Sequence, residues 1–288
     1  MPLNRGIADV IDAFEEGRTH TQRFVKNAGT AHALQWADCS FASGQPGYDA
    51  RVGVPAAFTP AIAARNDAIY FPPIQAGQER YLMGGTFWAN QATFNGEGSL
   101  VLFDLLGYYP LVDGDSTDEQ VFDNMLTLPR YASGESVGIV IVNHIAPAIQ
   151  AGIVTVNFTD ESNVDRSVTV TVPLVGQNLV CSGQDAVSNN TSTITIPLSG
   201  AARGVKRINS IMFGTAPGGL FCFYLVKILA TANFAGDNLV ATEKCFCTQN
   251  GMAMPRIYDG AWINWFDRIG TGTSRTVSWY GDLTFFWK

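Results

Sequence analysis

The residues that most often carry nucleophilic or acid–base chemistry are sparse in this chain. Histidine occurs only at His20, His32 and His144. One serine, Ser136, has Gly-x-Ser-x-Gly spacing, but the predicted strand 137–143 follows it, whereas the turn that presents a hydrolase nucleophile leads from a strand into a helix. His144 follows the apolar run Ile139 to Asn143, and this position predicts a strand end rather than a general base. We therefore expect no catalytic residues and no enzyme activity.

Two short motifs could hold a metal ion. Cys245 and Cys247 are two residues apart, but a structural zinc site needs a second pair of cysteines or histidines, and none has suitable spacing. The acidic segment Asp113 to Glu119 lacks the glycine expected at the sixth position of a calcium loop. No phosphate-binding Gly-x-x-x-x-Gly-Lys loop occurs. We expect no metal and no cofactor, and we interpret the five cysteines as reduced structural thiols.

Tryptophans crowd the end of the chain, where they could line a sugar site. The last segment alternates, however, and its apolar side chains are Val277, Trp279, Leu283, Phe285 and Trp287. Such alternation is typical of one buried face of a strand. We predict that this segment is a central strand or a subunit interface. For the preceding segment, we predict that Trp262, Trp265 and Phe266 form part of a partner interface.

Composition excludes several classes of protein. The chain has 288 residues, 15% of them charged, and a net charge of −7. Intrinsic disorder needs high charge and low hydrophobicity, and nucleic-acid binding through phosphates needs basic patches. The sequence has neither, and it shows no secretion signal and no long apolar run. We expect a protein made in the cytosol, with neither nucleic acid nor membrane as a partner. Its low charge also suits burial in an assembly.

One clear helix is predicted at the start of the chain. Ile7, Val10, Ile11 and Phe14 have the i, i+3, i+4, i+7 spacing of an apolar stripe. A basic stretch, Arg18 to Lys26, follows it. We interpret residues 1–30 as a helical arm and predict that its apolar stripe binds a partner, the alternative being that the helix packs on its own domain.

The rest of the chain, residues 31–288, predicts an all-β domain, an antiparallel and jelly-roll-like sandwich. In Ser167 to Val172 every second residue is valine, and Thr159 to Asp165 has the composition of a hairpin loop. A second short helix is predicted at Ser116–Leu126 from its capping-box spacing. A weak internal boundary is predicted near residues 130–135. The candidate strands are 68–71, 81–88, 99–105, 137–143, 153–159, 167–172, 192–197, 207–213, 221–229, 239–246 and 276–287.

Several stretches resemble one group of proteins. Asp12–Phe24, Trp36–Pro46, Leu106–Asp113, Thr127–Tyr131, Val154–Thr159 and Ile257–Ala261 are similar, in the same order, to segments of uncharacterised structural proteins of tailed phages. None of these segments is a catalytic motif. The resemblance implies a virion component made in the cytoplasm of a bacterial host.

The sequence also lacks the long helix and extended loop of a tailed-phage major capsid protein, which favours an accessory part. We therefore expect a non-enzymatic cement or decoration protein that binds and stabilises the major capsid shell. Its partners would be the major capsid protein or other virion proteins, and it would form a homo-oligomer, with a trimer favoured. The alternatives are a tail, neck or baseplate component, and a carbohydrate-binding module.

Overall fold

The structure is a computed structural model, and it describes residues 7–31, 35–41, 43–45, 68–90, 95–123, 126–145, 151–173, 180–182, 193–237, 241–246, 254–269 and 275–288. These residues form antiparallel sheets, one α-helix and one 3-10 turn. The all-β sandwich predicted from the sequence is confirmed. No helix in the described part of the chain is both long and apolar enough to cross a bilayer.

The strands belong to three sheets. Sheet A has the order β12-β4-β15-β1-β3, with β13 on β4, and comprises Thr242–Cys245, Arg80–Asn90, Arg275–Trp287, Thr19–Ala31, Ser43–Gln45 and Arg256–Ile257. Sheet B has the order β2-β14-β5-β11-β7 and comprises Trp36–Asp38, Ile263–Ile269, Asn95–Asp113, Leu220–Asp237 and Val137–Ile145. Sheet C has the order β6-β10-β8-β9 and comprises Gln120–Val121, Val205–Phe213, Ala151–Asp160 and Asp165–Pro173. The helix α1 spans Ile7–Glu15, and the 3-10 turn η1 spans Cys39–Phe41.

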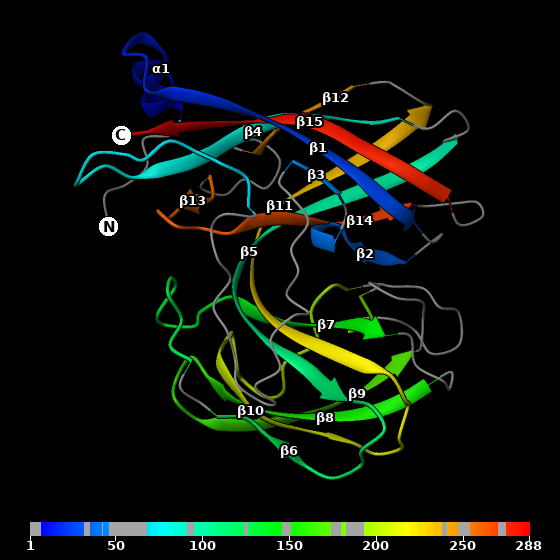
Figure 1. Ribbon diagram of the computed structural model, residues 1–288. Coiled ribbons are helices and arrows are strands. Elements are labelled where there is room, and N and C mark those ends of the chain that lie inside the picture. Colours follow the sequence, from blue (N-terminus) through cyan, green and yellow to red (C-terminus); the bar gives the residue numbers. More distant parts are fainter. Residues whose placement is uncertain are drawn as a thin grey trace.

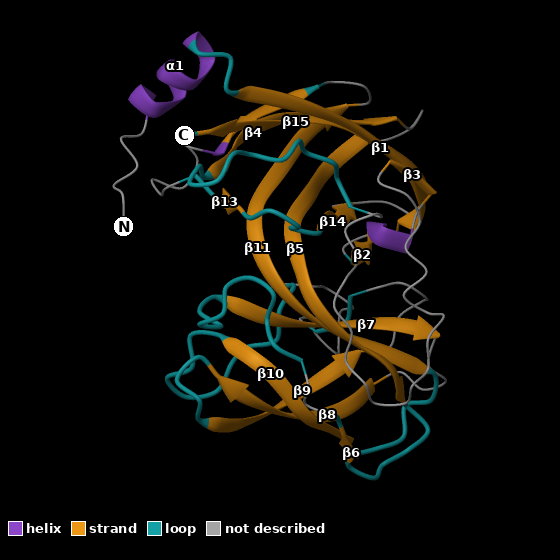
Figure 2. Cartoon of the chain, turned by 60° about the vertical axis from the view of Figure 1, so that its left-hand side comes forward, coloured by secondary structure: helices purple, strands orange, loops and turns teal. Residues whose placement is uncertain are grey.

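Sheet B joins two halves of the molecule. Its long strands β5 and β11 run from sheet A at one end to sheet C at the other (Figures 1 and 2). The register of this pair shifts at three places, such as between Leu225 and Val226. Because an extra residue in one strand bends a ladder and increases its twist, these shifts account for the curvature that lets one ribbon serve both halves.

Each half has its own core. Leu100 and Leu102 of β5 pack in a cluster with Trp279 and Leu283 of sheet A. Leu106 and Tyr109 of the same strand pack in another cluster with sheet C, whose contribution includes Val154, Val156, Phe158, Ile208 and Ile211. Asp104 lies on β5 between these two sets of residues and is fully buried. The two halves are therefore linked by continuous strands.

Most of the predicted strands are present, and several are longer than predicted. Residues 99–105 and 221–229 are the centres of β5 and β11. The hairpin at 159–165 is confirmed, because β8 and β9 pair directly and Asn163 adopts a left-handed turn conformation with a φ of 62°. Residues 68–71 and 193–197 are not regular strands, although Ile69 and Ile196 each donate one main-chain hydrogen bond to a strand. Residues 239–240 of the predicted strand 239–246 lie outside the described part.

Two local predictions were wrong. The described residues 116–123 contain no helix; Gln120 and Val121 form β6, and the Gln120 side chain is bound to the main chain of Asp113 in both directions. These bonds give the segment a turn in place of a helical cap. From Thr19 on, the basic stretch is strand β1 rather than an arm, because its residues pair with the C-terminal strand β15. The division of the chain into domains stays a prediction.

Candidate functional site

Helix α1 presents most of its apolar stripe to solvent. The exposed fractions of Ile7, Ile11 and Phe14 are 77%, 51% and 52%. The side of the helix that faces the protein carries Ala13, which is fully buried, and the partly buried Val10. The helix is thus anchored by its small residues, and its three largest apolar side chains are left without cover from the described residues.

The anchor of α1 lies on the C-terminal strand. Ala13 and Val10 pack against a cluster that contains Tyr81 and Phe286, and the ring centroids of Tyr81 and Phe286 are 5.4 Å apart in a stacked arrangement. Lys288 Nζ donates to Asp9 Oδ2 at 2.7 Å, and both side chains are mostly buried. The helix is therefore fixed on sheet A (Figure 2).

The other residues of the predicted partner interface do not lie at the surface, so this part of the prediction was wrong. Trp262, Trp265 and Phe266 are at most 1% exposed, and they lie on or directly before β14 in sheet B. Trp265 packs on Phe24 of sheet A with ring centroids 4.6 Å apart, and Phe266 stacks on Phe103 at 4.1 Å. Trp265 thus packs sheet B on sheet A and Phe266 packs within sheet B, so a partner cannot reach these rings.

The C-terminal aromatic strand is central, as one of the predicted alternatives stated. β15 lies between β4 and β1. Trp279, Leu283 and Phe285 face the core shared with sheet B, whereas Phe286 faces α1. Both faces of the strand are therefore covered within the chain. Because three of the tryptophans near the chain end (Trp262, Trp265 and Trp279) are buried, they cannot line a sugar site.

The remaining candidates for chemistry have structural positions. His144 is buried near the end of β7, and His20 lies in β1 with its ring 6.5 Å from that of Tyr70. Asp113 caps a turn by accepting the main-chain N–H of Asp115 at 2.9 Å. Of the four described cysteines, Cys39, Cys181 and Cys222 are buried and Cys245 is exposed. Cys247 lies outside the described residues.

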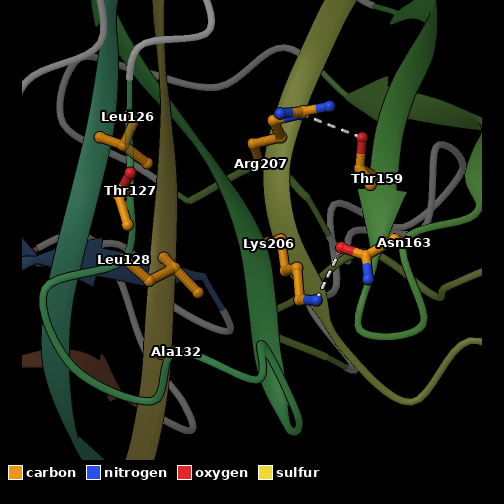
Figure 3. A pocket seen from close by; sticks show the side chains of 8 residues that line it. All are labelled: Leu126, Thr127, Leu128, Ala132, Thr159, Asn163, Lys206 and Arg207. Atoms are coloured by element: carbon orange, nitrogen blue, oxygen red, sulfur yellow. Dashed lines mark hydrogen bonds between the residues drawn. The ribbon is translucent and has the colours of Figure 1, made fainter.

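A small groove of about 160 Å³ lies in the half formed by sheet C (Figure 3). Lys206 Nζ donates to Asn163 Oδ1 at 2.8 Å, and Arg207 Nε donates to Thr159 Oγ1 at 3.2 Å. Leucines 126 and 128 face these cations from the other side of the groove. The groove offers two positive charges held by neutral partners, and Arg207 is exposed to solvent.

A buried acidic group lies at the join of sheets A and B. Asp267 of β14 is 1% exposed and accepts the indole N–H of Trp279 at 2.7 Å. Burial raises the pKa of Asp267 to about 6, although the bond from Trp279 opposes this rise. Asp38 and Cys39 are electrostatic neighbours, and burial raises the pKa of Cys39 well above its usual value. Residues 263–267 of β14 are all buried, so this strand has no alternation of apolar and polar positions from which it could be predicted.

Comparison with known proteins gives little. No protein-family model matches the chain, and no curated protein matches it. Among solved structures, the chain is similar to T=1 particles derived from infectious bursal virus, with 10% identity, a TM-score of 0.19, and coverage of 93% of this chain and 77% of that one. It is also similar to the VP2 subviral particle of infectious bursal disease virus, with 10% identity, a TM-score of 0.16, and coverage of 93% and 80%. Scores this low establish neither a shared fold nor a shared function.

Proposed function

We propose that this chain is a non-enzymatic structural component of a tailed-phage virion, and that it binds the major capsid protein or another virion protein through helix α1. The observation that carries the proposal is the outward apolar face of α1, made of Ile7, Ile11 and Phe14. Scattered single apolar residues are normal on a protein surface, but three on one face of a short helix form a contiguous patch.

The anchoring of α1 supports a docking role. A helix that is held by Ala13 and by the Asp9–Lys288 ion pair loses little conformational entropy on binding, because it is already in place. Asp12 and Glu15 are exposed on the same short helix. A complementary partner would therefore offer an apolar groove with a basic rim.

The resemblance to tailed-phage structural proteins supplies the class of assembly, and a cement or decoration protein is the role that we favour. Such a protein gains its affinity from the same contact repeated by symmetry, so one helix per chain is enough when the chains form a trimer. The rigid β body suits this role, since its strands connect the helix at one end to sheet C at the other.

The number of copies per particle tests the proposed place in the virion. Quantitative mass spectrometry of purified particles should find on the order of hundreds of copies, as expected for a contact repeated over the shell. A few dozen copies or fewer would favour the tail, neck or baseplate alternative. Absence of the chain from particles would contradict both.

The docking role of α1 needs a separate test. The double substitution Ile11→Glu, Phe14→Glu should abolish binding of the purified protein to particles that lack it, because two carboxylates cannot enter an apolar groove unpaired. Val164→Glu is the matched control, since Val164 is 44% exposed and lies at the tip of the β8–β9 hairpin. Binding that survives in the double variant would show that α1 is not the docking element.

A further inference from the structure

A cavity of about 280 Å³ lies where the two halves of the molecule meet. Its walls come from the start of β4, from β13 and the residues after it, and from Pro129 and Arg130 in the segment that precedes β7. Three arginines, Arg80, Arg130 and Arg256, line it. Three of the chain's 18 basic residues therefore lie around one cavity.

Each of the three guanidinium groups is held in place. Arg130 donates through Nε to Asp104 Oδ2 at 2.8 Å and through Nη2 to Asp104 Oδ1 at 2.7 Å, the two-bond geometry that fixes a guanidinium most firmly. Arg80 pairs with Asp259 at 3.1 Å and lies 4.4 Å from the centre of the Phe71 ring. The cations would therefore need little reordering on binding a ligand.

The third arginine is more accessible. Arg256 pairs with Glu79 at 2.7 Å and lies 4.6 Å from the centre of the Tyr258 ring. Its side chain is 43% exposed, so it lies at the mouth of the cavity. The ring of Tyr258 also lines the cavity, and it offers a flat apolar surface beside the charged groups.

Each of the three arginines has one carboxylate partner, so the ion pairs around the cavity carry no net charge. The carboxylates in its lining are Glu79 and Asp259, whereas Asp104, the partner of Arg130, is fully buried on β5 behind it. Nη2 of Arg130 also donates to the carbonyl of Leu105, but none of the described residues accepts a hydrogen bond from Nη1. The Arg130 side chain is only 7% exposed. Nη1 is not among the fully buried polar atoms that lack a partner, so water or a ligand in the cavity can reach this free donor.

We infer that this cavity binds a small ligand through a carboxylate or phosphate group, which accepts from Arg130 Nη1 and pairs with Arg256. A guanidinium presents its N–H groups in a plane that matches such oxyanions. The rest of the ligand would lie against Tyr258. Free phosphate and an acidic sugar would both bind in this way, because each offers an oxyanion to the same donors. This inference is independent of the proposed docking role of α1.

Calorimetric titration of the purified full chain tests the site, with inorganic phosphate, glucuronate and neutral glucose as the probes. We expect phosphate or glucuronate to bind and glucose not to bind. Tighter binding of phosphate would identify a phosphate site, and tighter binding of glucuronate a site for an acidic sugar. If neither anion binds at concentrations up to about 10 mM, the inference is wrong.

Two variants locate the binding. Arg256→Gln should weaken it about tenfold or more, the usual effect of losing one charged hydrogen bond, whereas Arg203→Gln, which is 74% exposed outside the cavity, should not change it. The double variant Arg130→Met, Asp104→Asn removes the buried donor together with its charge partner, and the asparagine oxygen can still accept from the main-chain N–H of Trp262. Binding should be lost in this variant while its thermal unfolding remains cooperative. Undiminished affinity there would place the ligand elsewhere and overturn the inference.

Discussion

Two sets of large apolar side chains, both predicted as partner surfaces, have opposite positions in the molecule. Ile7, Ile11 and Phe14 of α1 are more than half exposed, whereas Trp265 and Phe266 of β14 are buried. Both sets consist of large apolar side chains, so hydrophobicity alone does not tell the exposed set from the buried one. What separates them is the number of faces that the rest of the chain covers: β14 has a sheet neighbour on each edge and packed layers above it, but α1 rests on sheet A by one side only.

The largest effect should come from cutting the strand that supports both regions. Deletion of residues 283–288 removes Leu283, Phe285 and Phe286, all fully buried, from the centre of sheet A. We expect no cooperatively folded protein, as measured by circular dichroism during heating. Lys288→Met is the control, because it removes the ion pair with Asp9 and keeps the main-chain hydrogen bonds between residue 288 and Glu79. A truncated chain that melts like the intact one would contradict the central position of β15.

Removal of a single buried ring should also have a large effect, although a smaller one than the deletion of residues 283–288. Trp265→Ala leaves a cavity between sheets A and B beside Phe24, and we expect it to lower the free energy of unfolding by about 3–5 kcal/mol. Urea denaturation measures this change. A loss below about 1 kcal/mol would show that β14 is not a core strand and would restore Trp265 as a candidate surface residue.

The buried carboxyl beside these rings should make stability depend on pH. The pKa of Asp267 is about 6 in the folded chain, above its ordinary value of 3.8, so folding favours the protonated form. The resulting stabilisation is complete below pH 3.8 and is lost as the pH rises through 6. Asp267→Asn should therefore have a free energy of unfolding higher than that of the parent chain by on the order of 2 kcal/mol at pH 7, and about equal to it at pH 4. An equal difference at both pH values would contradict this burial.

The smallest effect on stability should come from the exposed face of α1. Phe14→Ser should change the free energy of unfolding by about 0.5 kcal/mol or less, because its ring already contacts water. Ala13→Glu is the matched control on the buried side, where a carboxylate would meet Tyr81 and Phe286 and should destabilise the chain clearly. If the two variants melt alike, the comparison between exposed and buried faces fails.

Much of the fold follows from local sequence patterns. Alternating valines in residues 167–172 predicted β9, the polar residues 159–165 predicted its hairpin, and the spacing of Ile7, Ile11 and Phe14 predicted α1. In each of these cases the partner is adjacent in sequence or the signal is the period of the element itself. Local physics therefore determined them.

Other elements were decided by contacts between distant parts of the chain. β1 is polar and basic, and it is a strand because it pairs with β15, more than 250 residues away, as in Thr19 with Phe286. The cavity inferred to bind an oxyanion depends likewise on Arg130 meeting Asp104 across two segments.

By itself, the sequence determined that this protein is an antiparallel β-sandwich with an amphipathic helix near its start, because alternation and helical spacing are properties of neighbouring residues. Only the tertiary structure decided which apolar residues became core and which remained at the surface. Burial depends on what covers a side chain, and the covering elements come from anywhere in the chain: sheets A and B enclose Trp265, whereas none of the described residues covers Phe14.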